Sequence, residues 1–299
     1  MNKQVEKLKR QDSVFWIVGL SCLLFALVTL LALIIDMAIT GWPRITQEFF
    51  FNFPSRFPEK SGIYSAWVGS LCVVVVTSCL AIPLGVATGV YLEEYAKKNL
   101  WTKIIEVNIL NLAGIPSVTF GLMALGFFVY ELHLGQSILT AGLTLGLLVL
   151  PIIIVTTREA IRTILSHIRE ASYALGATKW QTVWNHIIPY SSGGILTGVV
   201  IALSRAIGET APLITVGALT FIAFLPTSPV SDVSPFINFK WLMDPYTVMP
   251  IQMFNWVSRP QDEFHVNAAA AGVVLLSMTL FLNATAIYIR YRFRKKYKW

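Results

Sequence analysis

The chain has 299 residues, of which 55% are hydrophobic and 13% are charged, and its formal net charge is +7. Soluble domains average about 45–50% apolar and about 25% charged residues, so this composition excludes a soluble globular protein and indicates a membrane protein. The basic residues are divided among short connections rather than gathered on one domain, and we therefore expect no nucleic-acid partner.

Six apolar runs approach or exceed the roughly 20 residues that cross a hydrocarbon core. They lie at 14–39, 66–92, 107–130, 137–157, 191–212 and 265–289. The sequence thus predicts an all-α fold, a polytopic membrane helical bundle of six transmembrane helices. We divide it into a stub with the first transmembrane helix at 1–40, an extracytoplasmic loop at 41–65, a transmembrane domain at 66–289 and a basic tail at 290–299.

The orientation in the membrane follows from the Lys and Arg residues of the connections. The apolar part of 14–39 is longer than the roughly 7–15 residues of a signal-peptide core, so we expect a retained anchor. The connections on the side of the N-terminus hold 17 Lys and Arg residues, and those on the other side hold 5. Basic residues concentrate on the cytoplasmic side, so both termini are expected there.

Several residues inside the runs bear on packing. Pro83 and Pro116 are expected to kink or break the second and third spans. Glycine pairs at four-residue spacing let helices approach closely in lipid, and they are Gly85 and Gly89, Gly142 and Gly146, and Gly194 and Gly198. The three cysteines all fall inside runs, which predicts no disulfide framework.

The inner connection 158–190 has the pattern of a helix, a turn and a helix. Its first half, including Ile161 to Ile168, is apolar on one face at helical spacing. Gly176 can adopt the left-handed backbone that often ends a helix, and a second helix is expected from Lys179 to Ile188, stopping at Pro189. A helix that merely rests on lipid is the rival interpretation.

This connection resembles the characteristic loop of permease subunits of ATP-binding-cassette importers. The resemblance rests on the spacing of Glu170, Ala171, Gly176 and Pro189, with departures from the family pattern at Ser172, His186 and Ile188. It implies the type I importer permease fold and a loop that docks on a separate ATPase. The coupling residues would be Glu170, Ala171, Gly176, Ala177 and Pro189. The chain has no Gly-x-x-x-x-Gly-Lys-Ser/Thr sequence, so ATP and Mg are expected on the partner, and this chain itself is expected to bind no cofactor and to be no enzyme.

A charged pair lies in the fifth run, where Arg205 and Glu209 stand four residues apart. Charges inside a membrane cost about 2.5–3.5 kcal/mol each, so both need partners, and this spacing puts them on one helix face. Either they form a structural ion pair that holds two spans together, or Arg205 binds an oxyanion while Glu209 holds it ready or competes with the anion. Gly208, Pro212 and the length of the apolar run predict a break near 210–213 and a short segment returning along the outer surface.

Three segments narrow the resemblance to the permeases of phosphate importers. These are YLEEYA at 91–96, GIPSVTFGL at 114–122 and RAIGETAPL at 205–213. The Ala-Pro that follows Gly-Glu-Thr is typical of the PstA type rather than of its sister, the PstC type. The resemblance implies inorganic phosphate as cargo and a place in a bacterial cell membrane. It also implies a PstC-like sister permease, two copies of a PstB-like cassette ATPase and a PstS-like extracytoplasmic binding protein.

Further candidate residues and rival functions remain. Thr210, Ser117 and Thr119 are candidates for the substrate pathway, although Ser and Thr in spans often hydrogen-bond to backbone. The cargo could instead be sulfate, molybdate or an amino acid.

Two rival functions from different classes are an intramembrane enzyme that uses Glu209 and a scaffold that transports nothing. We expect no metal site, because the four histidines lie in connections or at span edges, at His133, His167, His186 and His265.

Overall fold

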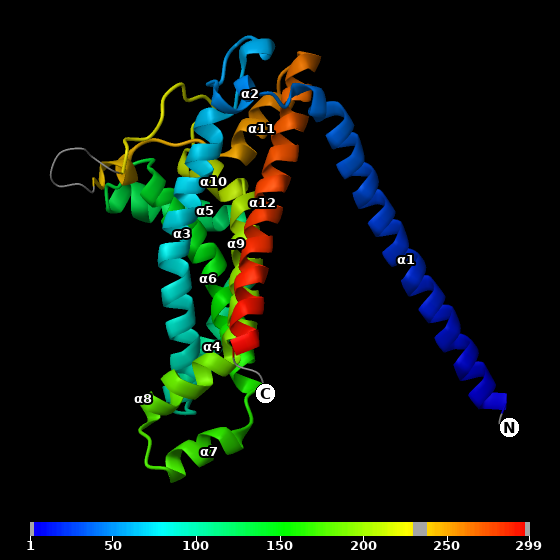
Figure 1. The fold of residues 1–299 in the computed structure, drawn as a ribbon, viewed down its shortest axis with the longest axis vertical. Helices are drawn as coiled ribbons and strands as arrows, with labels where there is room; N and C mark the ends of the chain where they lie inside the picture. The colour runs from blue at the N-terminus through cyan, green and yellow to red at the C-terminus, as the bar shows by residue number, and fades with distance from the viewer. Residues whose placement is uncertain (1–2, 230–237, 297–299) are drawn as a thin grey trace.

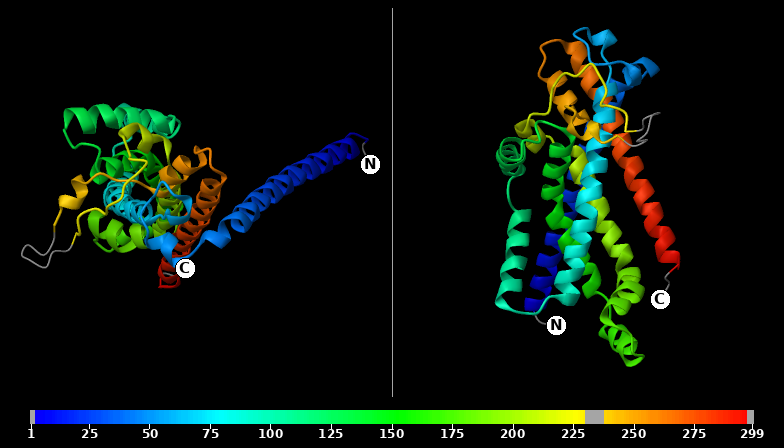
Figure 2. Two further views of the ribbon diagram at one scale, coloured as in Figure 1. Left: turned by 90° about the horizontal axis from the view of Figure 1, so that it is seen from above. Right: turned by 90° about the vertical axis from the view of Figure 1, so that its left-hand side faces the viewer.

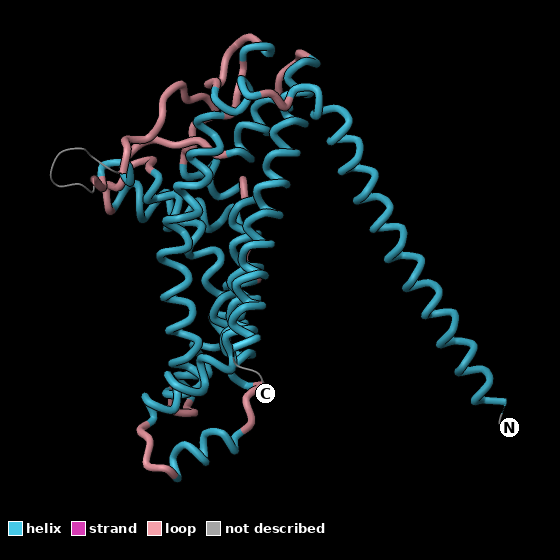
Figure 3. The backbone as a smooth tube through the Cα atoms, in the orientation of Figure 1, coloured by secondary structure: helices cyan, strands magenta, loops and turns pink. Residues whose placement is uncertain are grey.

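The computed structural model describes residues 3–229 and 238–296, and within these ranges it contains helices and no β-strand (Figure 3). Four long helices stand side by side in the body of the molecule, as Figure 1 shows. They are α3 (Tyr64–Val90), α6 (Ile138–Arg162), α9 (Ile188–Gly208) and α12 (Asp262–Lys296). The predicted all-α membrane bundle is confirmed.

Five helices of the described chain are long and apolar enough to cross a membrane, and a sixth crossing is a bent pair. The five lie at Lys7–Arg44, Tyr64–Tyr95, Ile138–Arg162, Lys179–Gly208 and Asp262–Arg292. The pair consists of α4 (Leu100–Ala113) and α5 (Ser117–Ala124), the second continued by the π-helix η4 (Leu125–Glu131), and it bends by 105°. The predicted count of six therefore holds if this pair is one span.

Pro116 breaks the third span, as predicted, whereas Pro83 lies inside an unbroken α3. Gly114 ends α4, and Pro116 stands directly before α5 with an extended ψ of 136°. Proline has no N–H to donate and disfavours helical backbone in the residue before it, so the chain turns here. The second part of the pair consequently lies across the bundle while α4 runs along it (Figure 2).

The predicted stop at Pro189 is wrong. The helix runs on from α8 (Lys179–Thr182) through the π-helix η5 (Val183–Ile187) into α9. In η5 the N–H of Ile188 donates to the carbonyl of Val183, five residues back. This wider turn just before Pro189 leaves room for a ring that would clash with the carbonyl four residues back in a regular helix.

Helix α6 lies at the centre of the bundle, between α3 and α9, because glycine lets the backbones approach. A Cβ added at Gly85 would lie 2.6 Å from Cγ2 of Ile153, and one added at Gly194 would lie 2.6 Å from Cβ of Ala160. Gly89, Gly142 and Gly198 likewise face α6 or α3, while Gly146 has open space around it. The predicted packing through small residues is thus observed for five of the six glycines.

Helix α1 (Lys3–Gly41) stands apart from the rest. It leaves the bundle at the end where α2 lies, and its axis diverges from α12 towards the N-terminus (Figures 1 and 2). Its contact with the bundle is close at Gly41, where an added Cβ would lie 2.6 Å from the backbone nitrogen of Ala270. Nearly all its apolar side chains are exposed, which in a membrane places them against lipid or another subunit.

The two outer connections fold into short helices at that same end. A compact apolar cluster joins them to α3 and α12 and includes Phe49, Ile63, Trp256 and Phe264. The short helices are η1 (Trp42–Arg44), α2 (Gln47–Phe51), η2 (Pro58–Lys60), η6 (Lys240–Met243) and α11 (Met249–Val257). The remaining elements are η3 (Tyr91–Tyr95), a π-helix that extends α3, then α7 (Ser166–Ala174) and α10 (Ala211–Val216).

Candidate functional site

The predicted break in the fifth span is present and falls slightly earlier than expected. Helix α9 ends at Gly208, Glu209 has an extended backbone with ψ 129°, and α10 begins at Ala211. The expected return along the outer surface is only partly correct, because Leu213 and Val216 of α10 are buried against neighbouring helices. The apolar face of α10 packs beside α5, where a Cβ on Gly121 would lie 2.6 Å from the carbonyl oxygen of Pro212.

Arg205 and Glu209 form an ion pair across this break. The Nε of Arg205 donates to Oε1 of Glu209 at 3.1 Å. The Arg205 side chain is 41% exposed and that of Glu209 is 17% exposed, so the guanidinium is the more accessible partner. Both Nη groups of Arg205 remain without a hydrogen-bond acceptor in the described chain. A guanidinium held on one side and open on the other can bind an oxyanion with two parallel hydrogen bonds.

The pair does not join two spans. Both residues belong to the segment that ends α9, so their contact fastens the two sides of one break. The structural interpretation, in which the pair holds separate helices together, therefore has no support in this geometry.

The other predicted pathway residues lie nearby in the fold but make no hydrogen bond to the pair within the described residues. Thr119 is exposed, and its hydroxyl donates to the carbonyl of Pro116 at 2.6 Å. This is the bonding to backbone that is common for Ser and Thr in spans. Ser117 begins α5 and Thr210 precedes α10, and these two helices pack against each other. Thr210 and Ser117 are both half-buried, and Ser117 directly follows the break at Pro116.

The predicted coupling loop projects from the opposite end of the bundle, where α7 and α8 lie (Figure 1). Gly176 has φ +82°, the left-handed backbone that the sequence predicts. Thr178 and Gln181 form a reciprocal cap that begins α8. The first helix of the loop differs from expectation: α6 continues to Arg162, the chain turns at residues 163–165, and α7 begins at Ser166.

The residues expected to contact an ATPase are placed on this projection with one exception. Glu170, Ala171 and Gly176 are exposed, and Ala177 is half-buried. Pro189 instead lies within the continuous helix leading to α9. Large apolar side chains are also exposed here: Leu175 is 90% exposed, and Trp180 and Trp184 stack with their ring centroids 5.6 Å apart. Exposed apolar surface on a polar connection is typical of a protein contact.

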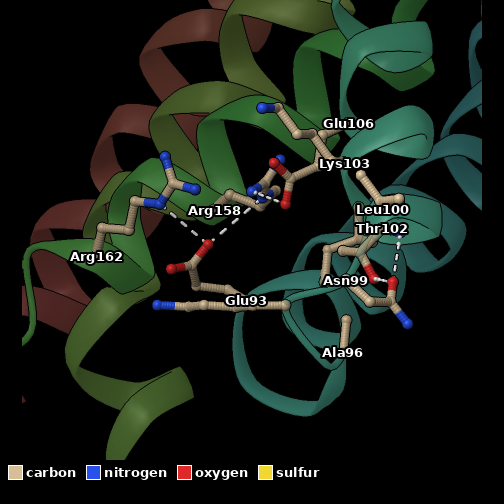
Figure 4. A pocket seen from close by; sticks show the side chains of 11 residues that line it. Glu93, Ala96, Asn99, Leu100, Thr102, Lys103, Glu106, Arg158 and Arg162 are labelled. Carbon is tan, nitrogen blue, oxygen red and sulfur yellow. Dashed lines mark hydrogen bonds and ion pairs between the residues drawn. The ribbon is translucent and has the colours of Figure 1, made fainter.

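Sequence reasoning missed a set of ion pairs at the end of the bundle where α7 and α8 lie. Arg158 pairs with Glu106 at 2.6 Å and with Glu93 at 3.4 Å, and Arg162 pairs with Glu93 at 3.0 Å (Figure 4). In the same region Arg169 of α7 pairs with the buried carboxylate of Glu94 at 2.7 Å. The available signal was the concentration of carboxylates at 93–106 among connections that are otherwise basic.

A known protein family accounts for this arrangement of spans and loop. The family described as "Binding-protein-dependent transport system inner membrane component" matches residues 81–298. The chain belongs to this family. It is accordingly a multi-pass inner-membrane permease subunit of the ATP-binding-cassette class, whose members work with ATPase and binding-protein partners.

Curated members of this permease family resemble the chain over most of its length. The phosphate transport system permease protein PstA of Mycobacterium leprae is 30% identical over 90% of this chain and 84% of its own. PstA of Haemophilus influenzae is 30% identical over 94% of this chain and 90% of its own. PstA 1 of Mycobacterium tuberculosis (strain CDC 1551 / Oshkosh) is 28% identical over 89% of this chain and 84% of its own.

Solved structures agree with the fold. The MetNI methionine transporter in an inward-facing conformation matches with a TM-score of 0.56 and 17% identity, covering 77% of this chain and 94% of that chain. At this identity the match bears on the fold alone. In this chain, α8 and the Arg205–Glu209 break lie at opposite ends of one continuous helix, Lys179–Gly208.

Proposed function

We propose that this chain is a permease subunit of an ATP-driven importer of inorganic phosphate and forms half of the translocation pathway. The observation that carries the proposal is the Arg205–Glu209 pair, a half-exposed guanidinium at a break inside a membrane span. The PstA proteins that match 89–94% of the chain support phosphate as the cargo. The relatives support phosphate as the cargo, whereas the geometry supports the position of the pathway.

Arg205 is suited to transport because it would bind phosphate only weakly. The two free Nη groups offer donors to a phosphate oxygen pair, while the carboxylate of Glu209 neutralises part of the charge. Conduction requires release as well as entry, and a partly neutralised arginine releases an anion more readily than a cage of arginines does. Thr210 and Ser117 would complete this half of the pathway, and the other half would come from a PstC-like sister permease.

ATP hydrolysis drives the cycle from outside this chain. Two copies of a PstB-like cassette ATPase would hold ATP and Mg, and their approach would move α7 and α8 through Glu170, Ala171, Gly176 and Ala177. The exposed apolar side chains of that projection support such docking. The permease would thereby alternate between outward-open and inward-open states, accepting phosphate from a PstS-like binding protein.

The deciding experiment is uptake of labelled phosphate in cells that lack this chain, restored with the wild type or with Arg205→Gln. We expect the variant to lower uptake by about tenfold or more, because hydrogen bonds to charged groups contribute about 1.5–3 kcal/mol. The control is Arg56→Gln, which removes an exposed arginine of the outer loop that makes no ion pair in the described chain. Equal amounts of protein in the membrane must be established for all three.

Each outcome has a meaning. Uptake that survives Arg205→Gln at the level of Arg56→Gln makes Arg205 a structural residue and moves the pathway elsewhere. If the wild-type chain itself fails to restore phosphate uptake, the cargo is wrong. Restored uptake of labelled sulfate or molybdate then identifies another oxyanion as the cargo.

A further inference from the structure

A cavity of about 790 Å³ opens at the cytoplasmic-loop end of the bundle, where η3, α4 and α6 meet (Figure 4). Its volume lies within the range of about 300–1,000 Å³ that is usual for small-molecule sites. None of its lining residues comes from α9 or α10, so it is separate from the Arg205–Glu209 break. The proposed transport step makes no use of it.

The walls of this cavity carry more positive than negative charge. The four cations that line it are Lys98, Lys103, Arg158 and Arg162, and the two carboxylates are Glu93 and Glu106. The carboxylates are engaged by the arginines, whereas both lysines lack an ion-pair partner within the described residues. Arg162 also pairs with Glu159, which lies just outside the lining, at 2.9 Å. Four cations against three carboxylates leave an excess of about one positive charge, and it is carried by the two lysines.

Arg158 supplies the fixed part of such a site. Its side chain is only 9% exposed, and two hydrogen bonds hold it, from Nε to Glu93 and from Nη2 to Glu106. Its Nη1 has no acceptor in the described chain. A guanidinium fixed by two carboxylates and flanked by flexible ammonium groups suits an anion with several oxygen acceptors.

The position of the cavity relative to the membrane indicates where such an anion would come from. The outward face of α4 beside the cavity is apolar and exposed, with Leu100, Trp101, Ile104 and Ile105 at its cytoplasmic end. A tryptophan next to lysines at the end of a span marks the level of the lipid head groups. Basic pockets between spans on the cytoplasmic side are places where phosphate-bearing head groups bind.

We propose that this cavity binds the phosphate group of an anion, either the head group of an anionic lipid or free phosphate of the cytoplasm. Lys98 and Lys103 attract the anion, and Arg158 orients it. The bound group balances the excess charge and joins α4 to the ends of α3 and α6. This site does not depend on what the protein transports.

The test uses the full-length chain, purified with its partner subunits in neutral detergent. Isothermal titration measures the binding of dihexanoyl phosphatidylglycerol, with dihexanoyl phosphatidylcholine as the neutral lipid and inorganic phosphate as the third ligand. The variant is Lys98→Gln with Lys103→Gln. The matched control is Lys7→Gln with Lys9→Gln, which removes two exposed lysines from the cytoplasmic end of α1, away from the cavity.

We expect saturable binding of phosphatidylglycerol or of phosphate to the wild type, weakened about tenfold or more in the cavity variant and unchanged in the α1 control. Binding of phosphatidylglycerol that resists inorganic phosphate identifies a lipid site, and displacement by phosphate identifies a site for the free ion. Phosphate bound at Arg205 would not respond to the lysine changes. This difference distinguishes it from phosphate bound in the cavity. The proposal is overturned if neither ligand saturates, or if both lysine variants behave alike.

Discussion

Gly121 has no side chain, and this lets α5 and α10 pack closely beside the candidate site. A Cβ at this position would collide with the hydroxyl of Thr215 and would lie 2.6 Å from the carbonyl oxygen of Pro212, both in α10. The close approach of α5 fixes the start of α10 and thereby the break at Glu209. Any larger residue must push the two helices apart.

We therefore expect Gly121→Ala to lower the free energy of unfolding by about 1–3 kcal/mol, the usual effect of overpacking. Thermal unfolding of the purified full-length chain measures the change. Gly126→Ala is the matched control, because Gly126 lies five residues later and has nothing within 4 Å of its Cβ position. Equal melting temperatures for the two variants would show that α5 and α10 are not in close contact.

Single residues with strong backbone preferences were predictable from the sequence. Gly176 has the left-handed backbone expected of it, and Pro116 breaks its span. Pro189 was misjudged because the compensating π-helical turn arises from hydrogen bonding over five residues, which the proline does not reveal. The partners of Arg158 and Arg169 were also out of reach, since they come from positions 52 to 75 residues away in the chain.

At the scale of elements, Arg169 connects three parts of the chain. It donates to Glu94 in η3, to the carbonyl of Ile161 in α6, and to the carbonyl of Ile164 in the turn that follows α6. Helix α7 is thus held to the second and fourth predicted spans by one side chain. Motion imposed on α7 would reach both spans through this contact.

We expect Glu94→Gln to lower phosphate uptake per ATP hydrolysed by about fivefold, equivalent to roughly 1 kcal/mol of lost coupling. The amide keeps the shape of the side chain and loses the charge that holds Arg169. Reconstituted complex with uptake and ATP hydrolysis measured together provides the ratio. Glu159→Gln is the control, because that carboxylate is 61% exposed and pairs with Arg162 three residues along the same helix.

A second variant separates coupling from simple instability. Exchanging the charges, Glu94→Arg with Arg169→Glu, should recover part of the ratio if the ion pair itself transmits the motion. An unchanged ratio in Glu94→Gln, or no recovery in the exchanged pair, would assign this contact a purely structural role.

The existence of the elements was easier to predict than their ends. Apolar runs located the five long helices and the bent pair α4–α5 with η4, since burying backbone in lipid requires long helices. The turn at 163–165 between α6 and α7 was missed because Ile161 to Ile168 keeps a helical pattern through it. The burial of α10 was missed because it depends on the approach of Gly121.

At the scale of the whole molecule, the distribution of charge predicts how the chain lies in the membrane. Helices α7 and α8 lie at one end of the bundle, and α2 and α11 lie at the other (Figure 1). We expect green fluorescent protein fused after the C-terminus to fluoresce and alkaline phosphatase fused there to be inactive. The same phosphatase inserted within 56–60 should be active. The reverse pattern would invert the orientation and contradict the proposed docking of a cytoplasmic ATPase.

The overall shape was only partly foreseeable. Composition alone indicates a membrane protein, and the order of spans follows from hydropathy. Neither composition nor hydropathy predicts the 105° bend of the third crossing or the divergence of α1. Both depend on surfaces with which the rest of the chain packs, and α1 carries an apolar surface on almost every side.

The uninterrupted helix from Lys179 to Gly208 makes the protein a mechanical lever. Its 30 residues span about 45 Å at about 1.5 Å per residue. One end carries the exposed pair Trp180 and Trp184, and the other end carries Arg205. A tilt of about 5° around the base displaces the tip by about 4 Å, which exceeds the length of a hydrogen bond. If Arg205 binds the cargo as proposed, a small movement at the α8 end of this helix is therefore enough to bring an anion within reach of that arginine or to withdraw it.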